Sequence, residues 1–135
     1  MSHLLDTSVL TRLSEPAIRA VVEPIAAIGR AARAGISDLE IGYSARNGGE
    51  WDALVGALDA LVLVETTADH VQRARRVQRL LAAGSQRGRK IPDLLVAAAA
   101  EQAGYTVLHY DADFDHIAAV TGQPCQWVVP PGSVD

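Results

Sequence analysis

Residues 61–84 read LVLVETTADHVQRARRVQRLLAAG, and they join a strand directly to a helix. Leu61–Glu65 is a short run of β-favouring aliphatic residues. Thr67–Ala83 follows as an amphipathic helix that Gly84 can end, because its apolar residues recur at spacings of three and four. The expected buried face consists of Val71, Ala74, Val77 and Leu81. A strand followed by such a helix is the repeating unit of a parallel α/β sheet.

The same alternation extends over the rest of the chain. Further strands are expected at His3–Asp6, Ala32–Ser37, Tyr105–Tyr110 and Gln126–Val129. Further helices are expected at Pro16–Gly29, Asp38–Arg46, Glu50–Ala60, Pro92–Gln102 and Phe114–Val120. Pro24 predicts a kink or break in the first of these helices, and Asn47-Gly48-Gly49 predicts the end of the second. The sequence therefore predicts an α/β fold: a three-layer α/β/α sandwich with a mostly parallel sheet, in a single domain over residues 1–135.

Composition narrows the class of protein. The 135 residues are 49% hydrophobic and 21% charged, which excludes a disordered chain. Cys125 is the only cysteine, so an intramolecular disulfide and a cysteine metal site are both excluded. The longest apolar run, Leu94–Ala100, is too short to span a bilayer, and the N-terminus lacks the basic region of a secretory signal. We therefore expect a cytoplasmic protein.

Five acidic residues are expected at one edge of the sheet. Asp6 closes the first strand, and Asp111 and Asp113 follow the fourth. Asp93 falls in the first turn of its helix, and Glu40 falls in the first turns of the helix after the second strand. Because ligands of parallel sheets gather beyond the carboxyl ends of the strands, these side chains should meet there.

Clustered carboxylates repel one another, and a hard divalent cation such as Mg²⁺ or Mn²⁺ relieves that repulsion. Such an ion can activate water and stabilise the leaving oxygen of a phosphodiester. Each acid taken singly could instead be a helix cap or turn residue, and we assign Asp115 to capping. Asp6 fits that alternative least, because an acid directly after a buried strand needs a partner. The whole cluster favours metal-dependent phosphate chemistry.

Four stretches carry a resemblance to a known family: LLDTSVL at 4–10, SDLEIGYSAR at 37–46, IPDLLVAAAA at 91–100 and HYDADFDHIA at 109–118. In these stretches, their order and the total length, the chain resembles the PIN-domain ribonucleases. Within them it is similar to the VapC-type toxins of bacterial VapBC toxin–antitoxin systems. The resemblance covers essentially the whole chain. It departs from the usual pattern at Tyr43 and Ser44, where another acid is common, and at Pro92 before Asp93.

This resemblance implies a PIN-like fold with five parallel strands and an endoribonuclease that depends on Mg²⁺ or Mn²⁺. It implies that the catalytic and metal-binding acids are Asp6, Glu40, Asp93, Asp111 and Asp113. Ser8 would be the small hydroxyl residue that orders the site. The resemblance also implies an RNA substrate, a homodimer, and inhibition by a cognate VapB-type antitoxin that inserts a peptide, often with a basic residue, into the acidic pocket.

Seven of the 12 basic residues lie in one segment that contains no acid: Arg73, Arg75, Arg76, Arg79, Arg87, Arg89 and Lys90. For the first four, a solvated helix face and a guide for RNA phosphates both remain open. For Arg87, Arg89 and Lys90, which lead directly into Asp93, we favour RNA binding. The net charge of −4 does not argue against this partner, because without the five clustered acids the chain has 11 acidic and 12 basic residues.

Two other functions compete with the nuclease. An aspartyl-phosphate phosphotransferase with Asp6 as nucleophile would need a second acid two residues on, where Ser8 stands. A non-catalytic PIN-like interaction module remains the alternative, and loss of motif acids would favour it. We expect His109 in the core or at the sheet edge and Trp51 in packing or an interface, so neither is assigned a catalytic role.

Overall fold

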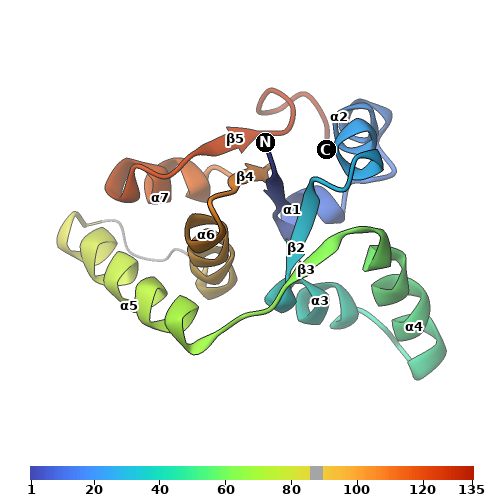
Figure 1. The fold of residues 1–135 in the computed structure, drawn as a ribbon, viewed down its shortest axis with the longest axis horizontal. Coiled ribbons are helices and arrows are strands. Elements are labelled where there is room, and N and C mark those ends of the chain that lie inside the picture. The colour runs from blue at the N-terminus through green and yellow to red at the C-terminus, as the bar shows by residue number, and fades with distance from the viewer. Residues whose placement is uncertain (86–89) are drawn as a thin grey trace.

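The protein has a sheet of five strands, and this sheet runs through the centre of the molecule (Figure 1). The computed structural model describes residues 1–85 and 90–135. The sheet order is β3-β2-β1-β4-β5, and every neighbouring pair is parallel. The strands are β1 (His3–Leu5), β2 (Ala31–Ala34), β3 (Val62–Val64), β4 (Thr106–His109) and β5 (Cys125–Trp127). The predicted parallel α/β fold with five strands is confirmed.

Helices cover both faces of this sheet, so there are two hydrophobic cores. Leu4 packs with α5, α6 and α7 in one core, whereas the next residue, Leu5, packs with α1 and α2 in the other. Val107 and Leu108 on β4 divide in the same way, because successive residues of a strand face opposite sides. The helices are α1 (Thr7–Leu10), α2 (Pro16–Ala27), α3 (Gly35–Gly42), α4 (Gly48–Gly56), the 3₁₀ turn η1 (Ala57–Ala60), α5 (Ala68–Ala83), α6 (Ile91–Ala103) and α7 (Asp113–Thr121).

Several predicted element ends are wrong. Helix α2 continues without a break through Pro24. Pro24 has no N–H to donate to the Ala20 carbonyl, but both residues lie on the exposed side of the helix, so water can reach that carbonyl. Strand β2 ends at Ala34, because α3 already begins at Gly35. Asn47 does not end a helix but begins α4, since its side-chain oxygen accepts a hydrogen bond from the Glu50 N–H.

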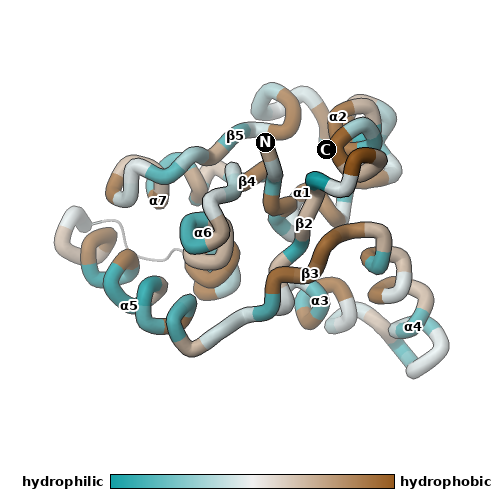
Figure 2. The backbone as a smooth tube through the Cα atoms, viewed as in Figure 1, coloured by the Kyte–Doolittle hydropathy of each residue, from teal (hydrophilic) through white to brown (hydrophobic). Residues whose placement is uncertain are grey.

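The helix α5 begins at Ala68, one residue later than predicted, ends at Ala83 as predicted, and has a different buried face. Val71 is 46% exposed, and His70 is buried in its place together with Ala74, Val77 and Leu81. His70 is turned inward by a capping box in which Thr67 and His70 exchange hydrogen bonds. Figure 2 shows the hydrophilic and hydrophobic turns that alternate along this helix. No helix in the described part of the chain is both long enough and apolar enough to cross a membrane.

Candidate active site

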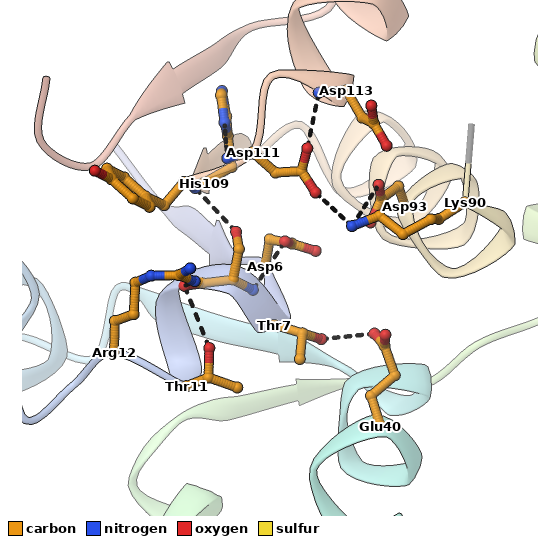
Figure 3. A network of polar contacts seen from close by, with 12 residues as sticks. Asp6, Thr7, Thr11, Arg12, Glu40, Lys90, Asp93, His109, Asp111 and Asp113 are labelled. Atoms are coloured by element: carbon orange, nitrogen blue, oxygen red, sulfur yellow. Dashed lines mark hydrogen bonds and ion pairs between the residues drawn. The ribbon is translucent and has the colours of Figure 1, made fainter. Parts of the chain in front are cut away.

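All five predicted acids lie at the carboxyl edge of the sheet. Asp6 directly follows β1, Asp111 follows β4, and Asp113 begins α7. Asp93 lies in the first turn of α6, and Glu40 lies in the second turn of α3. Figure 3 shows these carboxylates facing a common space. A cavity of about 230 Å³ occupies that space, and its lining is Asp6, Thr7, Ser8, Thr11, Arg12, Glu40, Lys90, Asp93, Tyr110 and Asp111.

Three of the acids are close enough to share one ion. Asp93, Asp111 and Asp113 each offer a carboxylate oxygen, and these oxygens lie within 4.8 Å of one another. The loop that holds them is fixed locally, because Oδ1 of Asp111 accepts a hydrogen bond of 2.9 Å from the Asp113 N–H. The turn-residue role that the sequence left open as an alternative for Asp111 is therefore compatible with its place in the cluster.

The two innermost acids are buried with unused oxygen atoms. Asp6 is 2% exposed and Asp93 is 4% exposed. Within residues 1–85 and 90–135, Oδ1 of Asp6 and Oδ2 of Asp93 accept no hydrogen bond. A buried carboxylate oxygen without a partner is costly unless a cation or proton neutralises it, so the residues fit a divalent ion.

The electrostatics of the cluster agree with this fit. Burial, with the charge of Glu40 adding to it, raises the pKa of Asp6 above its ordinary value. Burial and the charges of Asp6 and Asp111 raise the pKa of Asp93 to about 8, against the opposing effect of Lys90. In the metal-free protein Asp93 therefore holds a proton at neutral pH that a bound cation would displace.

Lys90 lies against the acids. Its Nζ donates to Oδ2 of Asp111 at 2.6 Å and is 4.0 Å from Oδ2 of Asp93. Burial by itself would raise the pKa of Asp111, but the hydrogen bonds from Lys90 and the Asp113 N–H, together with the charge of Lys90, outweigh it, so this pKa is lowered. Lys90 was predicted to guide RNA phosphates, together with Arg87 and Arg89; those two arginines lie outside the described residues.

Ser8 and His109 hold the strand ends in place around the acids. The Ser8 Oγ accepts a hydrogen bond of 2.9 Å from the Tyr110 N–H, which ties the start of α1 to the end of β4. His109 is fully buried, as predicted for a core residue, and its Nδ1 accepts from the Asp111 N–H at 3.3 Å. Burial lowers the pKa of His109, so its ring is the neutral form that this acceptor role requires.

Thr7 is a site residue that the sequence reasoning missed. Its Oγ1 lies 2.7 Å from Oε1 of Glu40 and 2.9 Å from Oγ of the buried Ser37. A hydroxyl has one proton, so Thr7 donates to Glu40 and accepts from Ser37. This chain of contacts orients Glu40 toward the cavity from α3. The only signal in the sequence was the position of Thr7 between Asp6 and Ser8.

Arg12 and Tyr110 form one wall of the cavity and were also missed. The Arg12 guanidinium lies 5.0 Å from the centre of the Tyr110 ring and donates to the Ser8 carbonyl at 2.7 Å. The Tyr110 hydroxyl donates to the Val134 carbonyl at 2.7 Å, so the tail of the chain supports this wall. The contacts of Tyr110 with Arg12 and with Val134 join residues far apart in sequence, so no local sequence pattern predicts them.

Two charged residues have structural partners. The prediction that Asp115 caps α7 is wrong. Its carboxylate accepts a hydrogen bond from the Trp127 indole N–H at 3.1 Å, and no side chain caps that helix. Arg73 donates twice to Glu101, at 2.6 and 3.1 Å, and this pair joins α5 to α6. Arg73 is thereby assigned to packing. The exposed residues Arg75, Arg76 and Arg79 remain candidates for RNA contact.

Comparison with known proteins matches residues 3–120 to the PIN domain family. The chain is 65% identical to Ribonuclease VapC51 of Mycobacterium tuberculosis over 135 residues, which is 100% of this chain and 98% of that protein. It is 46% identical to Ribonuclease VapC21 of the same species over 97% of this chain and 96% of that one. Among solved structures, DNA-bound VapBC from Salmonella typhimurium aligns with a TM-score of 0.78 and 16% identity, over 96% and 99% of the two chains.

Proposed function

The chain belongs to the PIN-domain family and, within it, to the VapC ribonucleases, and from this premise we propose that it is the toxin of a type II toxin–antitoxin pair and cleaves RNA as a metal-dependent endoribonuclease. The observation that carries the proposal is the cavity where four carboxylates meet, two of them buried with unused oxygens. The proposed cofactor is Mg²⁺, with Mn²⁺ as a substitute, because the ligand set consists of oxygen atoms. The proposed functional unit is a single PIN domain over residues 1–135.

The proposed site residues divide into two sides of the cavity. Asp93, Asp111 and Asp113 hold the cation, and Asp6 adds its charge from the end of β1. An ion bound there would supply an activated water and neutralise charge on the leaving oxygen of the phosphodiester. Glu40, which Thr7 fixes on the opposite side, orients the attacking water and accepts its proton. Ser8 keeps the ends of β1 and β4 in register beneath these acids.

The proposed partners are an RNA substrate, a cognate VapB-type antitoxin and a second copy of the chain in a homodimer, all in the cytoplasm. The antitoxin is proposed because similar folds occur in the VapBC complexes of Salmonella typhimurium and Rickettsia felis, both solved with DNA. The competing proposal of a non-catalytic interaction module has less support. A binding module has no need for two buried carboxylates with unused oxygens, and these weaken the fold unless a cation or a proton neutralises them.

Metal removal is the direct test of the proposed function. We expect the purified protein to cleave RNA with Mg²⁺ or Mn²⁺ and to lose all cleavage in EDTA. Induced expression of the wild type, but not of Asp6→Ala, should arrest growth, and sequencing of new RNA 5′ ends should map the cut sites. Cleavage that persists in EDTA, or in the Asp6→Ala protein, would contradict the proposal.

The raised pKa of Asp93 predicts that metal affinity increases with pH. A proton must leave this carboxyl group before it can bind the ion, and its pKa is about 8 in the metal-free protein. We expect Mn²⁺ affinity to rise by up to about tenfold per pH unit between about pH 6 and about pH 8. Titrations followed by electron paramagnetic resonance measure it. An affinity that does not change over this range would show that Asp93 is already ionised.

The same shift fixes the sign of the stability change. The pKa of Asp93 is raised from 3.8 to about 8, so protonation of Asp93 stabilises the metal-free folded state. This contribution is fully present below the unfolded-state pKa of 3.8 and is lost as the pH rises toward the folded-state pKa of about 8. The Tm of the metal-free protein should therefore fall between about pH 5 and about pH 8, and saturating Mg²⁺ should reverse the fall.

A further inference from the structure

The Lys90 side chain lies where a cation of the acid cluster would lie. It comes from the residue that precedes α6, and its Nζ sits between Asp111, at 2.6 Å, and Asp93, at 4.0 Å. Figure 3 shows the ammonium group reaching both carboxylates. These two acids are also two of the three whose oxygens can share a metal ion.

We propose that Lys90 is a resident cation that neutralises the acid cluster while metal is absent and that metal must displace to bind. This inference rests on the proposed metal dependence of the site and adds a residue that sets its metal affinity. Lys90 would thus be a positioning and affinity-determining residue of the site rather than a ligand.

Competition follows because Lys90 and the metal ion would use the same two carboxylate groups. A divalent ion on Asp93 and Asp111 would use the carboxylates that face the Lys90 ammonium, and two cations this close repel strongly in a half-buried site. Among the described residues, Arg12 is the other base that lines the cavity, but its guanidinium donates to the carbonyls of Ser8 and Asp135. Lys90 is therefore the group that has to move.

Lys90 can leave the acids without disturbing the fold. Its side chain is 61% exposed, and a lysine has a flexible four-carbon stem. The side chain of Asp93, in contrast, is 6% exposed and fixed in the first turn of α6. The ammonium group can therefore swing into solvent at the rim of the cavity, while the carboxylates stay in place for the metal.

The first test measures Mn²⁺ affinity in Lys90→Met, which keeps an unbranched stem and removes the charge. We expect the variant to bind Mn²⁺ about 5- to 20-fold more tightly than the wild type. We also expect a lower Tm without metal and a larger increase in Tm on Mn²⁺ addition. Lys90→Arg should remain close to the wild type in both measurements.

Arg46→Met is the matched control for the change in net charge. Arg46 pairs with Glu50 on the surface, and its side chain is 85% exposed. We expect its Mn²⁺ affinity to stay within about twofold of the wild type. Equal Mn²⁺ affinity in wild type and Lys90→Met would overturn the proposal and leave Lys90 with a purely structural ion pair.

A second test observes the displacement itself. Lys90 is the only lysine in the chain, so lysine labelled at Cε and Nζ gives one NMR signal. In the metal-free protein this signal should be shifted from that of free lysine, and titration with diamagnetic Mg²⁺ should move it to the free-lysine position. A signal that stays unchanged at saturating Mg²⁺ contradicts displacement.

The two proposals fail in distinguishable ways. Metal binding that moves the Lys90 signal, in a protein that cleaves no RNA, would sustain the role of Lys90 and refute the nuclease. Metal-dependent cleavage with equal Mn²⁺ affinity in wild type and Lys90→Met would refute only the role of Lys90. If neither the wild type nor Lys90→Met binds a divalent ion, both proposals are refuted.

Discussion

Replacement of Asp93 by asparagine is expected to reduce RNA cleavage by at least about a thousandfold at saturating Mg²⁺. Asp93 is the most buried of the three acids that can share an ion, and its Oδ2 has no hydrogen-bond partner among residues 1–85 and 90–135. An amide has nearly the same shape but no charge, so it binds Mg²⁺ weakly and cannot neutralise it. Single-turnover cleavage of a labelled RNA measures the loss.

The loss of activity should come without a loss of fold. Burial and the charges of Asp6 and Asp111 oppose ionisation of Asp93, so a neutral side chain removes repulsion from the metal-free protein. We therefore expect Asp93→Asn to have a Tm equal to or above that of the wild type at about pH 8 without metal. An inactive variant with a clearly lower Tm would indicate misfolding instead of loss of a metal ligand.

Asp115→Asn provides the chemically matched control. Asp115 is an exposed acid in the first turn of α7, two residues after Asp113, and it accepts a hydrogen bond from Trp127. The asparagine oxygen can keep that bond, so cleavage should stay within about twofold of the wild type. Equal losses in Asp93→Asn and Asp115→Asn would mean that the acid cluster is not the site of catalysis.

The positions of the acids could be predicted from the sequence because they depend on strand ends alone. Apolar runs such as 107–108, with both residues buried, mark a strand that is covered on both faces. An acid that directly follows such a strand must emerge at its carboxyl edge. This rule placed Asp6 and Asp111 in the cavity without any knowledge of side-chain contacts.

The contacts that tune those acids could not be predicted in this way. Thr7 meets Glu40 across a sequence separation of 33 residues, and Lys90 meets Asp111 across 21. Neither pair has a periodic pattern that relates its members, because the meeting depends on how α3 and α6 approach the sheet. The basic neighbours of Lys90 predict RNA binding, whereas its contacts are with two acids, Asp93 three residues on and Asp111 from another part of the chain.

Arg33 illustrates the same limit within a strand. The sequence AARA at 31–34 gives a weak strand signal with a charged residue in it, and a charged residue there suggests an exposed side chain. Arg33 is instead buried, and its guanidinium donates to the carbonyls of Leu58 and Leu61 and to the Asp38 carboxylate. A side chain with five donors can be buried when the fold supplies fixed acceptors.

Replacement of Arg33 by alanine is consequently expected to lower the free energy of unfolding by about 3 to 5 kcal/mol. The change leaves two buried carbonyl groups and the Asp38 carboxylate without their donor. Chemical denaturation in urea, with an unchanged dependence on denaturant concentration, measures the difference. Arg46→Ala removes an exposed arginine from an ion pair with Glu50, and it should change stability by no more than about 0.5 kcal/mol.

The Arg33 variant should also affect the active site, but in a graded way. Asp38 lies in the first turn of α3, and Glu40 in the next turn reaches the cavity from the same helix. Loss of the Arg33–Asp38 pair frees the start of α3, so Glu40 should lose part of its alignment with Thr7. We expect cleavage by the folded fraction to fall by about tenfold, with Mn²⁺ affinity unchanged, because Asp93, Asp111 and Asp113 belong to other elements. A parallel loss of Mn²⁺ affinity would show that Glu40 acts as a metal ligand rather than on the attacking water.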